Sequence, residues 1–460
     1  MIDAPADLLH RIRAHGQDHL LTGWSTLSAA ERRAFVGQLA GIDFGELERL
    51  YARRGEPHAL LPDPSAIAPM PVEDAASFGP DTVRLGEECL RRGEVAVLVV
   101  AGGQGSRLGF EQPKGLFPVG PVSGASLFRL HAEKVHALSR KYGAAVPMLV
   151  MTSAATTAET QAYFLAQNSF GLPRSQVIFF EQGTMPALDA ATGQLLLSQP
   201  GALNLSPNGH GGTLTALADT GLLADLKARG VKHVFYFQVD NPLAELAAPG
   251  FVGRHVEANS DASTKVVFKT RPDEKVGVLA LLDGKCGIVE YSDLPCELAN
   301  ARDAGGELLH RAGNTAIHLF SVAFLERVTQ GTDRLAFHLA RKKVPFFDAE
   351  TGTAVKPTTE NALKFELFVF DALPLADRWL TVRVRREDEF APLKNAGGAD
   401  CPEAVRAALS DFHARRLRAV GVEVADGVAV EIAPLFALTD ADLRAKIPAG
   451  TRVTGPTFFE

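Results

Sequence analysis

The sequence of 460 residues predicts an α/β fold built on a mixed central sheet, and three observations carry that prediction. Val95 to Ala101 is a continuous apolar and β-branched run, the pattern of a strand buried on both faces of a sheet. This run leads directly into a glycine-rich loop, and open α/β sheets bind nucleotides at such loops on their carboxyl edge. Apolar runs and helical stretches then alternate as far as about residue 380.

The periodicity of apolar residues places the individual elements. The predicted strands are 95–101, 146–152, 176–181, 231–239, 264–269, 276–282, 316–322 and 379–385. The predicted helices include 126–141, 156–167 and 213–229.

The amino-terminal region is predicted to be helical and then extended. Ser28 and Glu31 have the spacing of a capping box, and Asp43 begins a second helical pattern. Six prolines between residues 55 and 80 exclude a helix or a central strand there, so this stretch is expected to be an extended connection over a surface. No chemistry is assigned to residues 1–54, which we interpret as a helical cap.

From about residue 400 the pattern becomes that of a small α+β lobe. Residues 402–419 predict a helix, and residues 422–432 alternate around Ala425-Asp-Gly427, which predicts a hairpin turn. Three regions are predicted. They are an amino-terminal helical and proline-rich segment at 1–88, an α/β core at 89–398 and a carboxyl-terminal α+β domain at 399–460.

Composition excludes several classes of protein. A net charge of −7 argues against a general nucleic-acid binder, which needs a basic face. The longest apolar runs fall short of the ~18 residues that a membrane span requires, and the amino terminus lacks the pattern of a signal peptide. The four cysteines have no CxxC spacing, which favours reduced thiols and a cytoplasmic location. The expected partners therefore include neither a nucleic acid nor a membrane.

The loop after the first strand has the composition of an anion-binding site. Gly102, Gly103 and Gly105 lack Cβ atoms, so their backbone N–H groups can approach a phosphate closely. Arg107 and Lys114 add two positive charges to the same loop. The alternative is a tight glycine turn with two solvated cations, but here strand, glycines and cations coincide.

Two familiar phosphate motifs do not occur in this loop. The P-loop string Gly-x-x-x-x-Gly-Lys-Ser/Thr is absent from the sequence. The spacing from Gly103 through Gly105 to Gly109 is one residue too long for the dinucleotide fingerprint, and the next strand ends in Thr152-Ser153 instead of an acidic residue. An NAD-dependent oxidoreductase is therefore disfavoured.

A second strongly apolar run, 231–239, ends in Asp240-Asn241. A carboxylate at the carboxyl end of a central strand, facing a bound phosphate, is a suitable ligand for Mg²⁺ or Mn²⁺, because hard cations prefer oxygen. One carboxylate is sufficient, since Mg²⁺ usually keeps several waters. The alternative role for Asp240 is an N-cap of the following turn, and the two roles can coexist.

The string Gly-Gly-x-Gly-Ser-Arg-Leu-Gly, followed by Pro113-Lys114, resembles the signature loop of sugar nucleotidyltransferases. Its longer context resembles the eukaryotic-type UDP-sugar pyrophosphorylase (UDPGP) family, and within it the N-acetylglucosamine branch. The resemblance implies a Rossmann-like, GT-A-like nucleotidyltransferase core. It also implies a Mg²⁺-dependent reaction in which UTP and a sugar 1-phosphate give a UDP-sugar and pyrophosphate.

The resemblance also carries residue roles onto this sequence. It makes Lys114 the catalytic cation, with Arg107 beside it and Lys394 meeting the sugar phosphate, and makes Asp240 the metal ligand. The nucleotide-binding positions that it implies are Ala101, Gly102, Gly103, Gly105, Gln182 and Gly209. The sugar-binding positions are His210, Gly277, Glu290, Asn314, Phe368 and Phe370, of which the two phenylalanines have an equally good interpretation as inward-facing strand residues.

One position departs from the N-acetylglucosamine branch. That branch carries asparagine where this sequence has His210, whereas the glucose-type and broad-specificity branches carry histidine. The sequence therefore favours N-acetylglucosamine 1-phosphate as the substrate, with glucose 1-phosphate or a broad range of sugar phosphates as the alternative. A nucleotide-sugar-binding protein without catalysis is the alternative from another class, and the presence of Lys114, Asp240 and Lys394 together argues against it.

Overall fold

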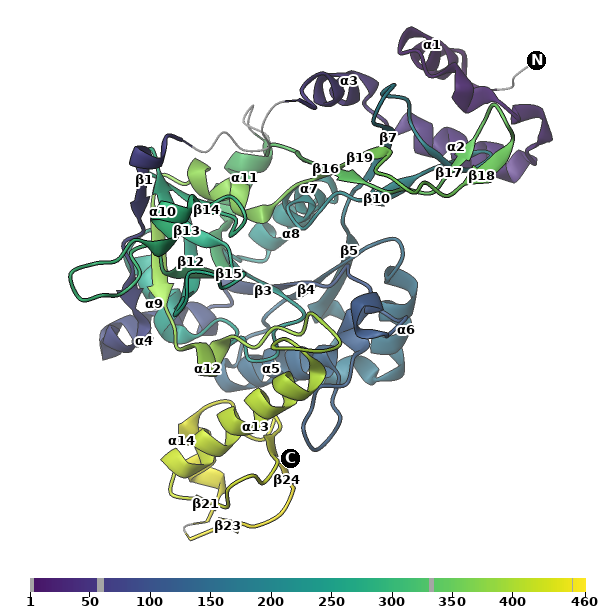
Figure 1. The fold of residues 1–460 in the computed structure, drawn as a ribbon. Helices are drawn as coiled ribbons and strands as arrows, with labels where there is room; N and C mark the ends of the chain where they lie inside the picture. The colour runs from purple at the N-terminus through teal and green to yellow at the C-terminus, as the bar shows by residue number, and fades with distance from the viewer. Residues whose placement is uncertain (1–3, 56–61, 331–334, 449) are drawn as a thin grey trace. The chain divides into compact units, whose positions relative to one another are not determined.

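The computed structural model describes residues 4–55, 62–330, 335–448 and 450–460 (Figure 1). Contacts group the chain into two compact units, and neither unit is one continuous stretch. The first unit consists of Met1–Leu60, Gly183–Gly212 and Leu335–Val369. The second consists of Leu61–Gln182, Thr213–Arg334 and Phe370–Glu460. The division at residues 88 and 398 stays a prediction.

The second unit is built on a sheet of 11 strands. Its main path runs in the order β2 (Glu73–Asp74), β20 (Trp379–Arg383), β12 (Ala262–Phe268), β15 (Ala312–Ser321), β11 (His233–Gln238), β3 (Val95–Val100), β4 (Met148–Thr152) and β5 (Val177–Glu181). Three further strands join beside β15, namely β1 (Ile67–Pro69), β13 (Val278–Leu282) and β14 (Lys285–Val289). All eight strands predicted from the sequence are present, with ends shifted by a few residues.

The sheet is mixed, as predicted, because β15 runs antiparallel to both of its neighbours, β11 and β12. The strands β11, β3, β4 and β5 are mutually parallel, and most of their residues are buried, although β5 is only partly so. From β3 the chain moves outward to β4 and β5 and then returns to β11 on the other side of β3. This reversal is a topological switch point, where the loops that follow the strands diverge and leave a crevice for a ligand.

Helices of the second unit connect and cover these strands. They are α4 (Pro80–Arg91), α5 (Leu127–Tyr142), α6 (Thr157–Ala166), α8 (Leu222–Ala228), α9 (Pro249–Glu257), α10 (Cys296–Asn300), α11 (Val322–Gln330) and α12 (Arg386–Glu389). The helices predicted at 126–141 and 156–167 are confirmed as α5 and α6. The single helix predicted at 213–229 is wrong, because Gly221 has a left-handed φ of 74° that separates α7 (Gly212–Asp219) from α8.

The first unit packs three helices against small antiparallel sheets. The helices are α1 (Ala6–Ala14), α2 (Ala29–Ala40) and α3 (Phe44–Ala52). The strands are β6 (Thr184–Pro186), β7 (Leu188–Asp189), β8 (Leu197–Gln199), β9 (Ala202–Leu203), β10 (Leu205–Pro207), β16 (His338–Lys342), β17 (Phe346–Asp348), β18 (Thr353–Val355) and β19 (Ala362–Glu366). The predicted capping box of Ser28 and Glu31 is confirmed, and the Asp43 carboxylate caps α3 by accepting from the Glu46 N–H.

The carboxyl-terminal lobe belongs to the second unit. Its helix α13 (Pro402–Ala419) begins and ends as predicted, and a shorter helix, α14 (Asp440–Lys446), follows. The predicted hairpin at 422–432 is wrong. Instead β21 (Glu423–Val424) pairs in parallel with β23 (Arg452–Val453), and β22 (Val430–Ile432) pairs in parallel with β24 (Thr457–Phe459).

The proline-rich stretch follows the prediction where the structure describes it, and Pro57 lies outside the described residues. It contributes two short strands, β1 and β2, and two short 3-10 helices, Pro64–Ala66 and Ala75–Ser77. Pro69 lies in β1, which pairs only with β13 and is therefore an edge strand, where proline is tolerated. Pro80 takes the first position of α4, where the N–H that proline lacks would have no partner within the helix. Among the described residues, no helix is long and apolar enough to cross a membrane.

Two buried histidines of the second unit predict a loss of stability at acid pH. Burial lowers the pKa of His131 to about 3 and that of His413 to about 3, against ~6.5 in an unfolded chain. Below pH ~6.5 the unfolded chain therefore binds protons that the folded protein does not, so the free energy of unfolding falls as the pH drops toward ~3. At pH ~5 the expected loss, relative to pH ~7.5, is about 2 kcal/mol for each histidine.

Urea unfolding at these two pH values checks the prediction. In His413→Gln, the difference in unfolding free energy between pH ~7.5 and pH ~5 is expected to be smaller by the contribution of one histidine. His10→Gln, at an exposed position of α1, is the matched control and should leave the difference unchanged. An identical pH dependence in His413→Gln and in the wild type contradicts the assignment.

Candidate active site

The carboxyl ends of four parallel strands bring the predicted nucleotide-site residues of the second unit to one edge of the sheet. The glycine loop follows β3, Ser153 follows β4, Gln182 follows β5 and Asp240 follows β11. In the sheet the four strands are neighbours in the order β11, β3, β4 and β5, and Figure 1 labels the last three. Because parallel strands end at the same edge, residues far apart in the sequence become neighbours there.

The glycine loop is closed by its own backbone. The Gly105 N–H donates to the Gln112 carbonyl at 2.9 Å, and the Lys114 N–H donates to the Gly103 carbonyl at 3.0 Å. Across the sheet edge, the Ser153 hydroxyl donates to the Gly102 carbonyl at 2.8 Å. These bonds hold the loop in one shape before any ligand arrives, which reduces the entropy lost on binding.

Gly102 and Gln182 lie against each other. A Cβ at Gly102 would lie 3.3 Å from the side-chain amide of Gln182, so a larger residue would press on that amide. The Gln182 backbone N–H donates to the Thr152 carbonyl at 2.9 Å, which extends the ladder between β4 and β5 by one bond. The amide of Gln182, which can donate and accept at once, is thus held beside the glycine loop.

Lys114 and Asp240, which are 126 residues apart, form an ion pair at this edge. The Lys114 Nζ lies 3.2 Å from Asp240 Oδ2, and the two side chains are 19% and 11% exposed. The same ammonium donates to the Leu393 carbonyl at 3.1 Å, and the Leu393 N–H donates to the Asp240 carbonyl at 2.8 Å. The backbone of Leu393 therefore contacts both Lys114 and Asp240, and Lys394 is the next residue in the chain.

The Asp240 carboxylate is also the candidate ligand for a divalent cation. Among the described residues, no group of three or more histidine, cysteine, aspartate and glutamate side chains could hold a metal alone. A single strand-end carboxylate fits Mg²⁺, which takes one or two protein carboxylates and completes its shell with waters and substrate phosphates. The donor set thus fits a metal that is held jointly with a nucleotide.

Three predicted sugar-site residues of the second unit also come together. The Asn314 N–H donates to the Gly277 carbonyl at 2.8 Å, and a Cβ at Gly277 would lie 3.3 Å from Glu290 Oε1. A β-bulge shifts the register of β15 against β12 just after Asn314, where Ala316 has a φ of 57°. The bulge changes the direction of the strand at Asn314, whose Oδ1 accepts from the Ala316 N–H at 2.9 Å.

Three other predicted residues gather in the first unit. His210 stacks on Phe368 with ring centroids 5.3 Å apart, and the Val369 N–H donates to His210 Nδ1 at 3.2 Å. Burial lowers the pKa of His210 to about 4, so the ring is neutral near pH 7 and carries its proton on Nε2. Gly209 has a φ of 84°, and a Cβ there would lie 2.4 Å from the Leu367 carbonyl oxygen.

The remaining predicted residues have less defined surroundings. Ala101 is buried and continues β3 by donating to the Met151 carbonyl at 2.8 Å. Arg107 is exposed at the tip of the glycine loop, and Phe370 is 9% exposed in a short helical stretch at Val369–Leu375. The roles assigned to these residues stay predictions.

Sequence patterns missed three contributors to this edge. Ser153 lies in a string whose only sequence signal is the lack of the acidic residue of a dinucleotide site, and the sequence assigns no role to Asn241. The Leu393 carbonyl has no sequence signature, because every residue has a backbone carbonyl. The aspartate–asparagine pair after a buried strand was the one available signal.

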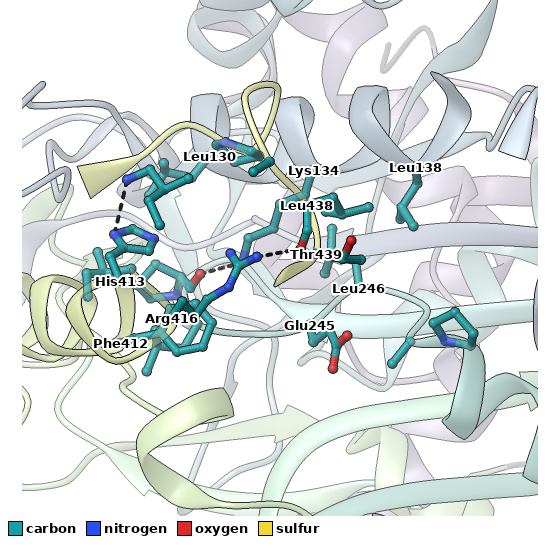
Figure 2. A pocket seen from close by; sticks show the side chains of 18 of the residues that line it. Leu130, Lys134, Leu138, Glu245, Leu246, Phe412, His413, Arg416, Leu438 and Thr439 are labelled. Carbon is teal, nitrogen blue, oxygen red and sulfur yellow. Dashed lines mark hydrogen bonds between the residues drawn. The ribbon is translucent and has the colours of Figure 1, made fainter. Parts of the chain in front are cut away.

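A separate cavity of about 90 Å³ lies in the second unit between α5, the loop at 242–249 and the carboxyl-terminal lobe (Figure 2). Its lining is mostly apolar, but Lys134 reaches the loop and donates to the Pro242 and Ala244 carbonyls at 2.6 and 2.8 Å. Burial lowers the pKa of Lys134 to about 8. No residue predicted for catalysis or binding lines it, so we do not place the reaction there.

A glycine loop at the point where the strand order of a sheet reverses is a typical binding site for a nucleoside triphosphate. The cation and the carboxylate at its edge are suited to a phosphate that gains charge during a reaction. Fold and site together define the class of nucleotidyltransferases.

Comparison with known proteins agrees with this class. Residues 72–401 match the sequence profile of the family described as UTP–glucose-1-phosphate uridylyltransferase. The chain is 37% identical to the UDP-N-acetylglucosamine pyrophosphorylase of Saccharomyces cerevisiae, covering 91% of this chain and 92% of the yeast protein. It is 38% identical to the human UDP-N-acetylhexosamine pyrophosphorylase-like protein 1, covering 91% of this chain and 87% of the human protein. The chain belongs to the UTP–glucose-1-phosphate uridylyltransferase (UDPGP) family.

Solved structures support the same fold. The UDP-N-acetylglucosamine pyrophosphorylase of Trypanosoma brucei, solved in complex with an inhibitor, superposes with a TM-score of 0.79 at 29% identity and 99% coverage of both chains. A UDP-N-acetylglucosamine pyrophosphorylase from Entamoeba histolytica gives a TM-score of 0.78 at 30% identity, covering 86% of this chain and 100% of the other. The predicted nucleotidyltransferase fold and family are confirmed.

Proposed function

We propose that the protein joins UTP and N-acetylglucosamine 1-phosphate, giving UDP-N-acetylglucosamine and pyrophosphate. The observation that carries this proposal is the Lys114–Asp240 pair beside the glycine loop, at the switch point of the sheet. The choice of sugar is supported by three relatives, which are described as a UDP-N-acetylglucosamine pyrophosphorylase, a UDP-N-acetylglucosamine diphosphorylase and a UDP-N-acetylhexosamine pyrophosphorylase-like protein.

In the proposed reaction, a phosphate oxygen of the sugar 1-phosphate attacks the α-phosphorus of UTP in line. The new P–O bond forms as the bond to the β-phosphate oxygen breaks, so pyrophosphate leaves with the electron pair of that bond. The glycine loop holds the triphosphate, the Gln182 amide pairs with the uracil, and Lys114 stabilises the charge that grows on the α-phosphate. Asp240 would hold a divalent cation, Mg²⁺ or Mn²⁺, which would supply further charge neutralisation.

The experiment that tests the proposed function is pyrophosphate release from UTP with a panel of sugar 1-phosphates. Turnover with N-acetylglucosamine 1-phosphate and Mg²⁺ is the expected result. Binding of UDP-sugar without release of pyrophosphate from any pair of substrates would instead support a binding protein that has lost catalysis.

His210 supplies the test of sugar preference. Its Nδ1 accepts from the Val369 N–H, so the proton that the neutral ring can donate to a sugar is on Nε2, at the far side of a rigid ring. An asparagine carboxamide is smaller and presents donor and acceptor together, which suits an acetamido group. We therefore expect His210→Asn to shift kcat/KM toward N-acetylglucosamine 1-phosphate over glucose 1-phosphate by roughly 5- to 150-fold, the range that a hydrogen bond or modest clash covers.

The measurement is kcat/KM for both sugars in the wild type and in His210→Asn. His338→Asn is the matched control, because His338 packs on the same Phe368 ring at 4.4 Å but has no predicted contact with sugar. If His210→Asn leaves the ratio between the two sugars unchanged, then His210 does not discriminate at the second carbon of the sugar.

We also propose a cytoplasmic location, where UTP and sugar phosphates are available. All four cysteines, Cys89, Cys286, Cys296 and Cys401, are free thiols, which suits a reducing compartment. Burial raises the pKa of Cys89 to about 11 and that of Cys286 to about 12, so these two thiols are unreactive near pH 7.

A further inference from the structure

A short segment of backbone, residues 389–394, lies directly alongside the end of β11. Three hydrogen bonds connect the two. The Glu389 carbonyl accepts from Asn241 Nδ2 at 2.7 Å, the Ala391 N–H donates to Asn241 Oδ1 at 3.1 Å, and the Leu393 N–H donates to the Asp240 carbonyl at 2.8 Å. The segment therefore follows the strand end as an added strand would, although no regular ladder is present.

The side chain of Asn241 makes two of these three bonds. Its carboxamide is buried, at 3% exposure for the residue, and both its acceptor and its donor are used by backbone groups two residues apart. A backbone residue in a strand offers one N–H and one carbonyl in a similar arrangement. The asparagine thus substitutes for a rung of the ladder at the point where β11 turns away toward the loop at 242–249.

The other side of the segment is held by a buried ion pair. Lys265 Nζ lies 2.5 Å from Glu389 Oε2, and the two side chains are 2% and 8% exposed. The Glu245 N–H donates to the same carboxylate oxygen at 3.4 Å. Lys265 belongs to β12 at the β-bulge opposite Thr315, so the position of Glu389 is determined from within the sheet.

We infer that Asn241 is a positioning residue, whose carboxamide fixes the register of residues 389–394 against Asp240 and so places Leu393 and Lys394 for the reaction. The inference rests on the proposed function and on the role that the family resemblance implies for Lys394, which is to meet the phosphate of the sugar. The Leu393 carbonyl takes its place beside the Lys114 ammonium, and Lys394 projects from the next residue. A shift of the segment by a fraction of a residue moves both of these groups while it leaves the glycine loop in place.

This role predicts a selective effect on the sugar phosphate. The glycine loop and Gln182 are held by bonds that do not involve Asn241, so binding of UTP alone should depend little on it. The contact with the sugar phosphate depends on where residues 389–394 lie. Damage to the fold in general would weaken the binding of both substrates.

The test compares Asn241→Ala with the wild type in two measurements. The first is steady-state kinetics: kcat/KM for the sugar 1-phosphate is expected to fall at least 10-fold, while the dissociation constant of UTP, measured without sugar, changes less than 3-fold. The second is amide hydrogen exchange, in which peptides that contain Ala391 and Leu393 are expected to exchange at least 10-fold faster in the variant. If Asn241→Ala does not fold, Asn241→Ser, whose shorter side chain cannot span both bonds, is measured instead.

Gln176→Ala is the matched control. Gln176 is also a buried amide with two hydrogen bonds, from Nε2 to the Val146 carbonyl and to the Ser139 hydroxyl, both at 2.7 Å. Gln176 precedes β5, so it lies at the edge where the parallel strands begin, opposite to the edge that holds the site. Its removal should lower the stability of the fold without a selective loss of kcat/KM for the sugar phosphate.

Three results would overturn the inference. They are unchanged exchange in residues 389–394, faster exchange with no effect on the sugar phosphate, and equal losses for UTP and sugar phosphate. A wild-type protein that turns over no substrate pair contradicts the proposed function instead, and the exchange measurement still decides whether Asn241 holds the segment.

Discussion

Lys114→Ala is expected to lower kcat by roughly 10²-fold or more while the KM for UTP changes little, because a preorganised charge acts most strongly on the charge that develops in the transition state. In the structure the ammonium is already in place: it is 19% exposed on its side chain and held by Asp240 and the Leu393 carbonyl. Partial burial reduces the screening of its charge by water.

Steady-state kinetics with saturating sugar phosphate measure this effect. Lys141→Ala is the matched control, since Lys141 forms a lysine–aspartate pair with Asp442 at 2.9 Å in the same unit. The control is expected to keep wild-type kcat within about twofold, because surface ion pairs contribute little. A tenfold rise in the KM for UTP with unchanged kcat would assign Lys114 to ground-state binding instead.

Asp240→Asn is expected to lower kcat by roughly 10²-fold or more and to raise the Mg²⁺ concentration needed for half-maximal activity at least tenfold, since a neutral amide is a much weaker ligand for a hard cation. The structure also predicts the direction in which Lys114 changes the Mg²⁺ requirement. Lys114 Nζ, 3.2 Å from Asp240 Oδ2, repels a second cation at that carboxylate. Lys114→Ala should therefore lower the Mg²⁺ requirement of the residual activity, opposite to Asp240→Asn.

Titration of activity with Mg²⁺ in both variants, and in Asp442→Asn as the control from the Lys141 pair, checks this prediction. Wild-type activity in excess chelator would show that no metal is involved. An unchanged Mg²⁺ requirement in Asp240→Asn would mean that the cation is held elsewhere.

The local elements of this protein could be predicted because each depends on residues close together in the sequence. Val95–Val100 could be predicted as a strand because a short β-branched apolar run is typical of a strand that is buried on both faces of a sheet. The amino-terminal end of α2 follows from the Ser28 capping box, and that of α13 follows from Pro402 in the first helical turn. The glycine loop and Asp240 were found because each directly follows such a strand.

The choice of partners was decided only by the tertiary structure. The alternation at 422–432 is compatible with a hairpin, but β21 and β22 pair in parallel with strands from the last residues of the chain. The apolar run at 316–322 predicts a strand. It does not predict that β15 starts at Ala312, contains a bulge beside Asn314 or runs antiparallel to its neighbours. Pairing depends on which apolar faces meet after the chain has folded, and periodicity describes only one strand at a time.

The same distinction applies to the site. The family, the glycine loop, the candidate catalytic lysine and the single aspartate could be predicted from the sequence, because these lie in short strings with a composition that few other functions need. Only the tertiary structure brought Lys114 to Asp240 across 126 residues and placed residues 389–394 beside them through Asn241. The physical reason is that these contacts use a backbone carbonyl, a backbone N–H and an ordinary asparagine, groups whose chemistry becomes specific only through their position.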